Sequence, residues 1–366
     1  MNVIIAAGGT GGHVFPAQAL AVELIARGHK CKWIGRPDSL ESRTAQDTAI
    51  AFHPVRMSGL RGKRLDKQLI ALWQCLVASI SLVLWMRRQS RKLPSLVVTF
   101  GGYTSVAAGI AAWCTRLPLI IHEQNSFAGS SNRLLARWAN AVCCGFDSVF
   151  PQLPHRHYLG NPIRSQRTPS YRKDTRPLRL LVLGGSLGAA SLNQAVCALL
   201  TKHRLIHPLH LVHQCGTTSY QQTRSAYLAL AANQPLLRLR LQTFLQRIDW
   251  YYPWCDLIIC RAGAITLAEV TQAGKYALLV PFPHATDNHQ WHNAKALVSS
   301  GGASLLQDDA RLPNNLAQAI LPLLQQPAAA ARTSLHPRGK LLYKLARPDA
   351  ARAMADLVET MQPDPA

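Results

Sequence analysis

The sequence predicts an α/β protein of two Rossmann-like domains, on three observations. An apolar run over residues 3–7 leads into a glycine-rich loop at 8–13 (GGTGGH) and then a helix. A second apolar run at 179–183 leads into residues 184–189 (GGSLGA) and another helix at about 191–201. A chain of 366 residues is also too long for one hydrophobic core. Strand, glycine loop and helix in this order direct backbone N–H groups toward an anion, most often a phosphate.

The first of these units contains a residue that a plain phosphate cradle does not need. Residues 3–7 are predicted as a short buried strand. We place Pro16 near the first helical position, where its fixed φ is tolerated, and expect the helix to end near Arg27, before Gly28. His13 then lies where the loop joins the helix. A glycine turn required only for packing, and a capping or surface histidine, are the alternatives at this point.

Polar clusters follow several of the other predicted strands. The clusters lie at 101–103, 122–125, 261–264 and 284–290, after strands predicted at 95–100, 117–121, 256–260 and 276–281. Open α/β sheets bind ligands at the carboxyl ends of their strands. We therefore expect these polar residues to converge on an interdomain cleft. The polar, proline-bearing stretch at 160–177 is predicted as the linker.

The composition favours anionic partners inside the cell. The formal net charge is +22, which suits nucleic acid, an acidic membrane surface or phosphorylated substrates. The basic residues are scattered without a DNA- or RNA-binding signature, so nucleic acid is not the expected partner. Nine cysteines without a C-x-x-C pair predict reduced thiols, and neither a disulfide framework nor a zinc site. No signal peptide is expected.

Several side chains suit a nucleotide-sugar. Gly263 and Ala264 open a helix whose N–H groups are suited to a pyrophosphate, and Glu269 is suited to ribose hydroxyls. Arg164 and Ser186 are candidate phosphate donors. For Glu269 the alternative is an ordinary exposed helix carboxylate.

In order, these motifs match a known family. They are GGTGGH at 8–13, SGLRGK at 58–63, GGY at 101–103, HEQN at 122–125, GNPIR at 160–164, GGS at 184–186, RAGA at 261–264 and HQ at 289–290. Over nearly its full length the chain resembles the MurG family of bacterial N-acetylglucosaminyltransferases. The resemblance implies a GT-B fold and transfer of GlcNAc from UDP-GlcNAc to undecaprenyl-pyrophosphoryl-MurNAc-pentapeptide (lipid I), forming lipid II for peptidoglycan.

The resemblance also implies which residues contact the donor. Leu245 matches the position at the uracil, Glu269 the ribose-binding acid, and Gln290 a contact to the GlcNAc hydroxyls. The chain departs from the family pattern at Leu187 and over 246–253. The full set of matching donor positions is Thr10, Gly11, Gly12, Asn125, Arg164, Ser186, Leu245, Ala264, Ile265, Thr266, Leu267, Ala268, Glu269 and Gln290.

The implied reaction is an inverting displacement at the anomeric carbon, in which a base takes the proton of the acceptor 4-hydroxyl. We assign that role to His13, because histidine, with an ordinary pKa near 6.5, is largely neutral at pH 7. Acceptor positioning and a pyrophosphate contact are the other roles for His13. Helix N-termini and Arg164 would neutralise the leaving group, so we expect no metal and no cofactor.

An uncharged stretch from Leu69 to Met86 predicts a membrane-facing helix. Basic residues flank both ends of this stretch, whereas a membrane-spanning helix normally has an excess of basic residues at one end, so spanning is not expected. The other alternative is a crossover helix buried in the protein. We expect a partly packed helix with an apolar patch that docks on anionic lipid. The patch residues are Leu69, Leu72, Trp73, Leu76, Ile80, Arg87 and Arg88.

Two domains follow from this interpretation. Residues 1–162 form the acceptor- and membrane-facing domain, onto which a C-terminal helix at about 341–362 packs back, and residues 163–340 bind UDP-GlcNAc. The expected location is the cytoplasmic face of the bacterial inner membrane. The competing functions are a UDP-GlcNAc 2-epimerase-like enzyme and a basic nucleic-acid-binding protein.

Overall fold

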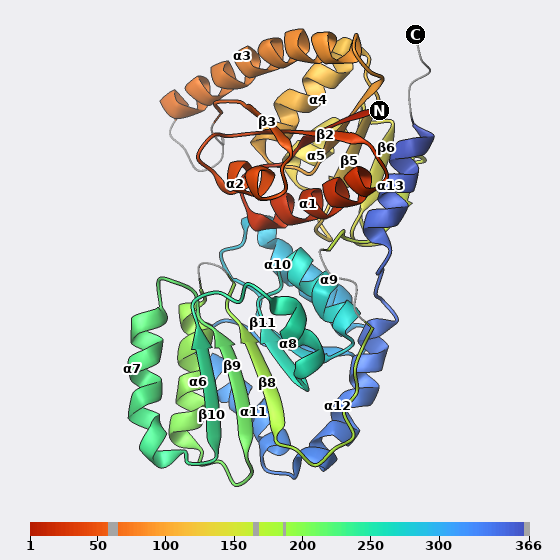
Figure 1. The fold of residues 1–366 in the computed structure, drawn as a ribbon. Helices are drawn as coiled ribbons and strands as arrows, with labels where there is room; N and C mark the ends of the chain where they lie inside the picture. Colours follow the sequence, from red (N-terminus) through yellow and green to blue (C-terminus); the bar gives the residue numbers. More distant parts are fainter. Residues whose placement is uncertain (58–64, 164–167, 186–187, 362–366) are drawn as a thin grey trace. The chain divides into compact units, whose positions relative to one another are not determined.

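The computed structural model describes residues 1–57, 65–163, 168–185 and 188–361. The chain divides into two compact units: unit 1 comprises Met1–Arg164 with Arg347–Ala366, and unit 2 comprises Ser165–Ala346. Each unit contains one parallel sheet with helices on both faces (Figure 1). The predicted fold class, two α/β units each with a parallel sheet, is therefore confirmed.

Unit 1 contains a seven-stranded sheet in the order β3-β2-β1-β4-β5-β6-β7. The chain builds outward from β1 to β3 and then returns to place β4 beside β1, so the strand order reverses between β1 and β4. Such a switch point is where α/β sheets bind ligands, beyond the carboxyl ends of the strands. The elements are β1 (Asn2–Ala6), α1 (Gly11–Ala26), β2 (Lys30–Gly35), α2 (Leu40–Asp47), β3 (Ala51–Pro54), α3 (Leu65–Ser90), β4 (Ser95–Thr99), α4 (Tyr103–Thr115), β5 (Leu119–Glu123), α5 (Ser130–Leu135), β6 (Ala141–Cys144), β7 (Arg156–Tyr158) and α13 (Ala350–Thr360).

The first glycine loop is shorter than predicted, because α1 begins at Gly11. Thr10 is the N-cap in extended backbone, and its carbonyl accepts the N–H of Val14 at 3.1 Å. The placement of Pro16 near the helix start was therefore wrong: it lies inside α1, where it removes one helical hydrogen bond. The other end of the helix agrees with the prediction, since Gly28 follows it with φ +85°.

A helix from the far end of the chain completes unit 1. α13 packs along α1 (Figure 1), and its Met354 and Val358 are buried in the same core as strand β1. Arg27 at the end of α1 donates to the carboxylates of Asp356 at 2.6 Å and Glu359 at 2.9 Å. Apolar burial and an ion-pair cluster thus both join α13 to unit 1.

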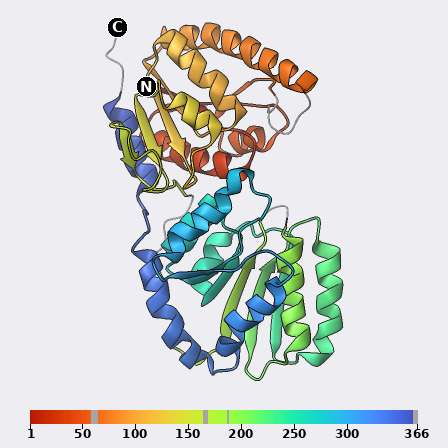
Figure 2. The same cartoon turned by 180° about the vertical axis from the view of Figure 1, so that it is seen from behind.

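Unit 2 contains a six-stranded parallel sheet in the order β10-β9-β8-β11-β12-β13, with its switch point between β8 and β11. Helices α6, α7 and α11 pack on one face and α8 and α9 lie on the other, while α12 contacts both α9 and α11 (Figures 1 and 2). The elements are β8 (Leu178–Leu183), α6 (Ala190–Lys202), β9 (Leu209–Gln214), α7 (Tyr220–Leu230), η1 (Ala231–Asn233), β10 (Leu237–Gln242), α8 (Ile248–Trp254), β11 (Leu257–Cys260), α9 (Ala264–Ala273), β12 (Tyr276–Leu279), η2 (Thr286–Asn288), α10 (His289–Val298), β13 (Ala303–Leu305), α11 (Leu312–Leu324) and α12 (Ala328–Tyr343).

Within the predicted linker at 160–177, residues 160–163 belong to unit 1 and residues 168–177 are packed onto unit 2. The buried guanidinium of Arg332 donates to the carbonyls of Asp174 and Pro177 at 2.6 and 2.9 Å. Lys275, also buried, donates to the carbonyl of Ser170. This stretch is therefore structured chain rather than a free connector.

Candidate active site

In unit 1 the loops after β1 and β4 meet at the switch point. Gly102 has φ +82°, and a Cβ on it would lie 2.7 Å from the carbonyl oxygen of Gly8. The Nδ1 atom of His13 lies 3.2 Å from that same oxygen. Because a carbonyl only accepts, this bond places the ring proton on Nδ1 and makes Nε2 the acceptor of the neutral ring. The predicted catalytic histidine thus lies at the carboxyl edge of its sheet, with its tautomer set.

The start of α1 supplies the neighbouring backbone donors. Thr10 and Gly12 are exposed and Gly11 is half-buried. The N–H groups of Gly11 and Gly12 are the first two of the helix and have no helical acceptor. No Thr10 side-chain cap bond is made within the described residues. These N–H groups and the helix dipole therefore favour an anion at this edge.

The HEQN segment does not simply follow its strand as predicted, because His122 and Glu123 belong to β5 and are buried. One oxygen of Glu123 accepts the backbone and side-chain N–H groups of Asn125 at 2.9 and 3.2 Å. The other accepts Gly129 N–H and Asn132 Nδ2, both at 2.9 Å. Glu123 therefore holds the predicted donor contact Asn125 in place. The motif was visible in the sequence, but this role was not.

His122 links β5 to the end of β7. Its Nε2 lies 3.1 Å from the carbonyl of Gly160, and its Nδ1 lies 3.1 Å from Nε2 of Gln124. Burial lowers the pKa of His122 to about 4, with a smaller contribution from His13 nearby. This second histidine therefore stays neutral in the folded protein and supports the site without titrating near pH 7.

In unit 2 the second glycine loop lies at the corresponding switch point. Gly184 donates its N–H to the carbonyl of Gln214 at 2.9 Å, and Gly185 and Gly188 have φ +85° and +90°. The predicted phosphate contacts Arg164 and Ser186 lie outside the described residues, as do Leu187 and the 58–63 motif.

Helix α9 begins beside that loop, directly after β11. Gly263 is its N-cap, and the N–H groups of Ala264, Ile265 and Thr266 are the first of the helix. The side chains of Ala264 and Ile265 are buried, so these residues present only backbone to a ligand. Leu267 is turned inward, with its N–H donated to the Gly263 carbonyl at 2.9 Å. Among the predicted positions 264–268, the backbone of 264–266 is therefore the part suited to a phosphate.

Each of the remaining donor positions in unit 2 is held by a neighbour. The Tyr252 hydroxyl donates to Oε2 of Glu269 at 2.8 Å, and burial, followed by this carboxylate, raises the pKa of Tyr252 well above its ordinary value. Leu245 donates its N–H to Oε1 of Gln214 at 3.0 Å. Gln290 accepts a backbone N–H at 2.9 Å through its own Oε1. No motif in the sequence points to Tyr252 or Gln214, since neither belongs to a polar cluster that follows a predicted strand.

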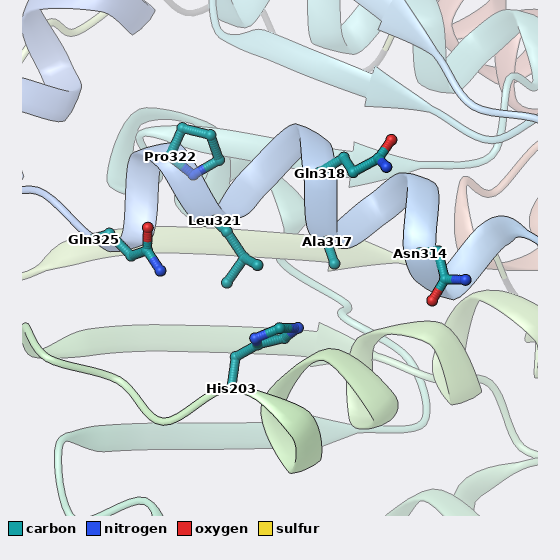
Figure 3. A pocket seen from close by; sticks show the side chains of 7 residues that line it. All are labelled: His203, Asn314, Ala317, Gln318, Leu321, Pro322 and Gln325. Carbon is teal, nitrogen blue, oxygen red and sulfur yellow. The ribbon is translucent and has the colours of Figure 1, made fainter.

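A surface hollow in unit 2 and the placement of side chains that could hold a metal ion are also relevant to ligand binding. A surface hollow of about 450 Å³ lies between His203, after α6, and Gln318 and Leu321 of α11 (Figure 3). It lies at the amino edge of the sheet, where α6 leads into β9, away from the glycine loop. In the described ranges, no group of three or more His, Cys, Asp or Glu side chains is placed to hold a metal ion.

Helix α3 packs on α4 (Figure 1). One stripe of its side chains is buried and another is exposed. Leu82 and Met86 are buried, whereas Leu72 and Leu76 are each 53% exposed and Trp73 is 66% exposed. By length and composition, Gln68–Ser90 could cross a membrane, but 28% of its most apolar 18-residue segment is buried in the protein. The other predicted patch residues, Leu69, Ile80, Arg87 and Arg88, are also exposed.

The chain matches known proteins over both units. The glycosyltransferase family 28 N-terminal domain matches residues 3–144, and the C-terminal domain of that family matches residues 179–347. A relative from Alkalilimnicola ehrlichii is 40% identical over 361 residues, covering 97% of each chain, and one from Acinetobacter baylyi is 36% identical, covering 98% of this chain and 97% of the relative. Both are named UDP-N-acetylglucosamine–N-acetylmuramyl-(pentapeptide) pyrophosphoryl-undecaprenol N-acetylglucosamine transferase.

Solved structures agree. The crystal structure of Acinetobacter baumannii MurG superposes with a TM-score of 0.81 at 33% identity, covering 98% of this chain and 99% of that one. A UDP-N-acetylglucosamine 2-epimerase from Listeria monocytogenes has a TM-score of 0.65 at 13% identity, which shows a shared fold alone. The chain is thus an enzyme of glycosyltransferase family 28 with the GT-B fold, and it belongs to the MurG family of N-acetylglucosamine transferases.

Proposed function

We propose that this protein transfers N-acetylglucosamine from UDP-N-acetylglucosamine to the 4-hydroxyl of MurNAc in lipid I, forming lipid II for the bacterial cell wall, and thereby serves cell shape and division. The observation that carries the proposal is the name shared by relatives that are 36% and 40% identical over nearly the whole chain. No specific observation favours the epimerase or the nucleic-acid alternative.

Unit 2 binds the donor in this proposal. The N–H groups at the start of α9 and the glycine loop after β8 receive the pyrophosphate, together with Ser186. Arg164, at the end of the first segment of unit 1, is the other proposed phosphate contact. Glu269, oriented by Tyr252, accepts the ribose hydroxyls. Leu245 presents its backbone to the uracil, and Gln290, whose Oε1 is already used, donates through Nε2 to a sugar hydroxyl.

Unit 1 receives the acceptor. His13 is the general base, because its Nδ1 bond to the Gly8 carbonyl leaves Nε2 as the proton acceptor. The N–H groups of Gly11 and Gly12 and the amide of Asn125, held by Glu123, are the proposed donor contacts of this unit and favour negative charge. General-base assistance of this kind contributes typically ~10²–10⁴-fold.

Attachment to the membrane completes the proposal. The exposed stripe of α3 inserts among the lipids of the inner membrane, and Arg87 and Arg88 contact their anionic headgroups. This peripheral position, on the cytoplasmic face, brings the protein to a lipid-linked acceptor.

The test is transfer by the purified protein from UDP-GlcNAc to a lipid I analogue, with UDP-GalNAc as the comparison donor. We expect a lipid II analogue from UDP-GlcNAc; free ManNAc formed without acceptor would instead indicate the epimerase. His13→Ala should lower kcat by ~10²–10⁴-fold with donor affinity retained. His157→Ala, at another half-buried histidine of unit 1, is the matched control. Near-normal kcat in His13→Ala would remove the base role.

A further inference from the structure

A buried chain of hydrogen bonds lies beneath the second glycine loop of unit 2. His213 of β9 is fully buried. Its Nδ1 lies 2.8 Å from the hydroxyl of Tyr227 on α7, and its Nε2 lies 3.0 Å from Oδ1 of Asn193 on α6. Asn193 in turn donates through Nδ2 to the carbonyl of Cys215 at 2.9 Å. Three polar side chains from three elements thus form one connected path that ends on the backbone after β9.

Only one arrangement of protons satisfies this path. Asn193 donates to a carbonyl through Nδ2, so its Oδ1 is the atom that faces His213 and accepts. Nε2 of His213 must then carry the ring proton, and Nδ1 must accept from Tyr227. Burial lowers the pKa of His213 to about 3, which keeps the ring neutral.

The backbone at the end of this path supports both nucleotide-facing segments of unit 2. Gly188 approaches the Cys215 carbonyl so closely that a Cβ would collide with it. Gln214, the preceding residue, accepts the N–H of Gly184 through its carbonyl and the N–H of Leu245 through its side chain. A shift of the β9 end would therefore move the glycine loop and the Leu245 segment together.

We propose that His213, with Tyr227 and Asn193, positions the glycine loop for the donor nucleotide by fixing the Cys215 carbonyl. The inference rests on the proposed function, in which unit 2 binds UDP-GlcNAc. Stability alone does not require the path, because apolar residues of similar shape would fill this core of leucine and valine side chains equally well. A fully satisfied polar network instead specifies one geometry.

The test is Tyr227→Phe, which keeps the ring and removes the hydroxyl. Nε2 of His213 still faces the Asn193 oxygen and keeps its proton, whereas Nδ1 loses its donor, so the Nδ1 signal in nitrogen NMR should move to that of an acceptor without a hydrogen bond. The Kd for UDP, measured by calorimetry, should rise about 5-fold, corresponding to roughly one hydrogen bond. The KM for UDP-GlcNAc should rise in parallel, with kcat nearly unchanged.

Leu230→Ala is the matched control, because Leu230 is buried on the same helix but lies outside the path. It should lower the Tm and leave the Kd for UDP unchanged. An unchanged Kd in Tyr227→Phe, or an equal rise in Leu230→Ala, would overturn the positioning role. Should Tyr227→Phe not fold, Asn193→Leu carries the same test, since it cuts the path at Cys215. Failure of the wild-type protein to bind UDP would instead overturn the proposed donor site itself.

Discussion

Replacing Leu72 and Leu76 of α3 together by aspartate should release the protein from anionic vesicles. Each leucine is 53% exposed, so about half of its side chain remains to be buried in lipid. Full burial of a leucine contributes ~1.5–3 kcal/mol, which leaves about 1 kcal/mol for each residue. Each new carboxylate is in addition repelled by the anionic surface, by about 0.5–1 kcal/mol. The total of about 3 kcal/mol corresponds to a roughly 100-fold weaker partition.

Co-sedimentation with phosphatidylglycerol vesicles measures this partition directly. The matched control is Leu228→Asp, since Leu228 is 61% exposed but lies on α7 of unit 2. The double variant should also keep the wild-type Kd for UDP, because α3 belongs to unit 1. Partition of the double variant within about 3-fold of wild type, or an equal loss in Leu228→Asp, would show that the exposed stripe of α3 does not hold the protein on the vesicle.

Three more predictions follow from contacts within the units. Glu123→Gln should destabilise the protein by about 2–3 kcal/mol and raise the KM for UDP-GlcNAc, because the amide cannot accept all four N–H donors that hold Asn125 and its loop. An unchanged midpoint of urea unfolding together with an unchanged KM would contradict this. Gly102→Ala should lower the free energy of unfolding by about 1–3 kcal/mol and lower kcat, because φ is +82° and the new methyl group would collide with the first glycine loop. A Tm and a kcat equal to those of the wild type would contradict this. Acid should destabilise the fold, because the pKa values of His122 (about 4) and His213 (about 3) lie below the ordinary 6.5 and the unfolded chain binds the extra protons. The free energy of unfolding should therefore keep its full value above pH 6.5 and fall by about 2 kcal/mol per histidine by pH 5. A midpoint of urea unfolding that does not change from pH 7.5 to pH 5 would exclude this.

Local patterns account for the part of the fold that could be predicted. The apolar run before each glycine loop, and Gly28 after its helix, are signals carried by adjacent residues. Pro16 misled the prediction for the same reason: proline favours a first helical turn, and glycine disfavours helix. In the folded chain the Thr10 cap starts the helix five residues earlier than that preference suggests.

The supporting contacts of the site could not be predicted, because they join residues far apart in the chain. Nothing in the sequence distinguishes Glu123 from other acidic residues near a strand end, but in the structure its hydrogen-bond partners include Asn132 of α5. Tyr252 reaches Glu269 from the preceding helix, and His213 joins two helices. Such pairs depend on tertiary packing, and a single sequence does not show which distant residues come into contact.

Transfer of GlcNAc to a lipid-linked acceptor is best tested by identifying the product itself. Purified protein is incubated with UDP-GlcNAc and a lipid I analogue, and the lipid product is analysed by mass spectrometry and NMR. We expect a disaccharide in which GlcNAc is joined to the 4-hydroxyl of MurNAc with inverted anomeric configuration, formed only when both substrates are present. A retained configuration, another hydroxyl, or no lipid product at all would contradict it.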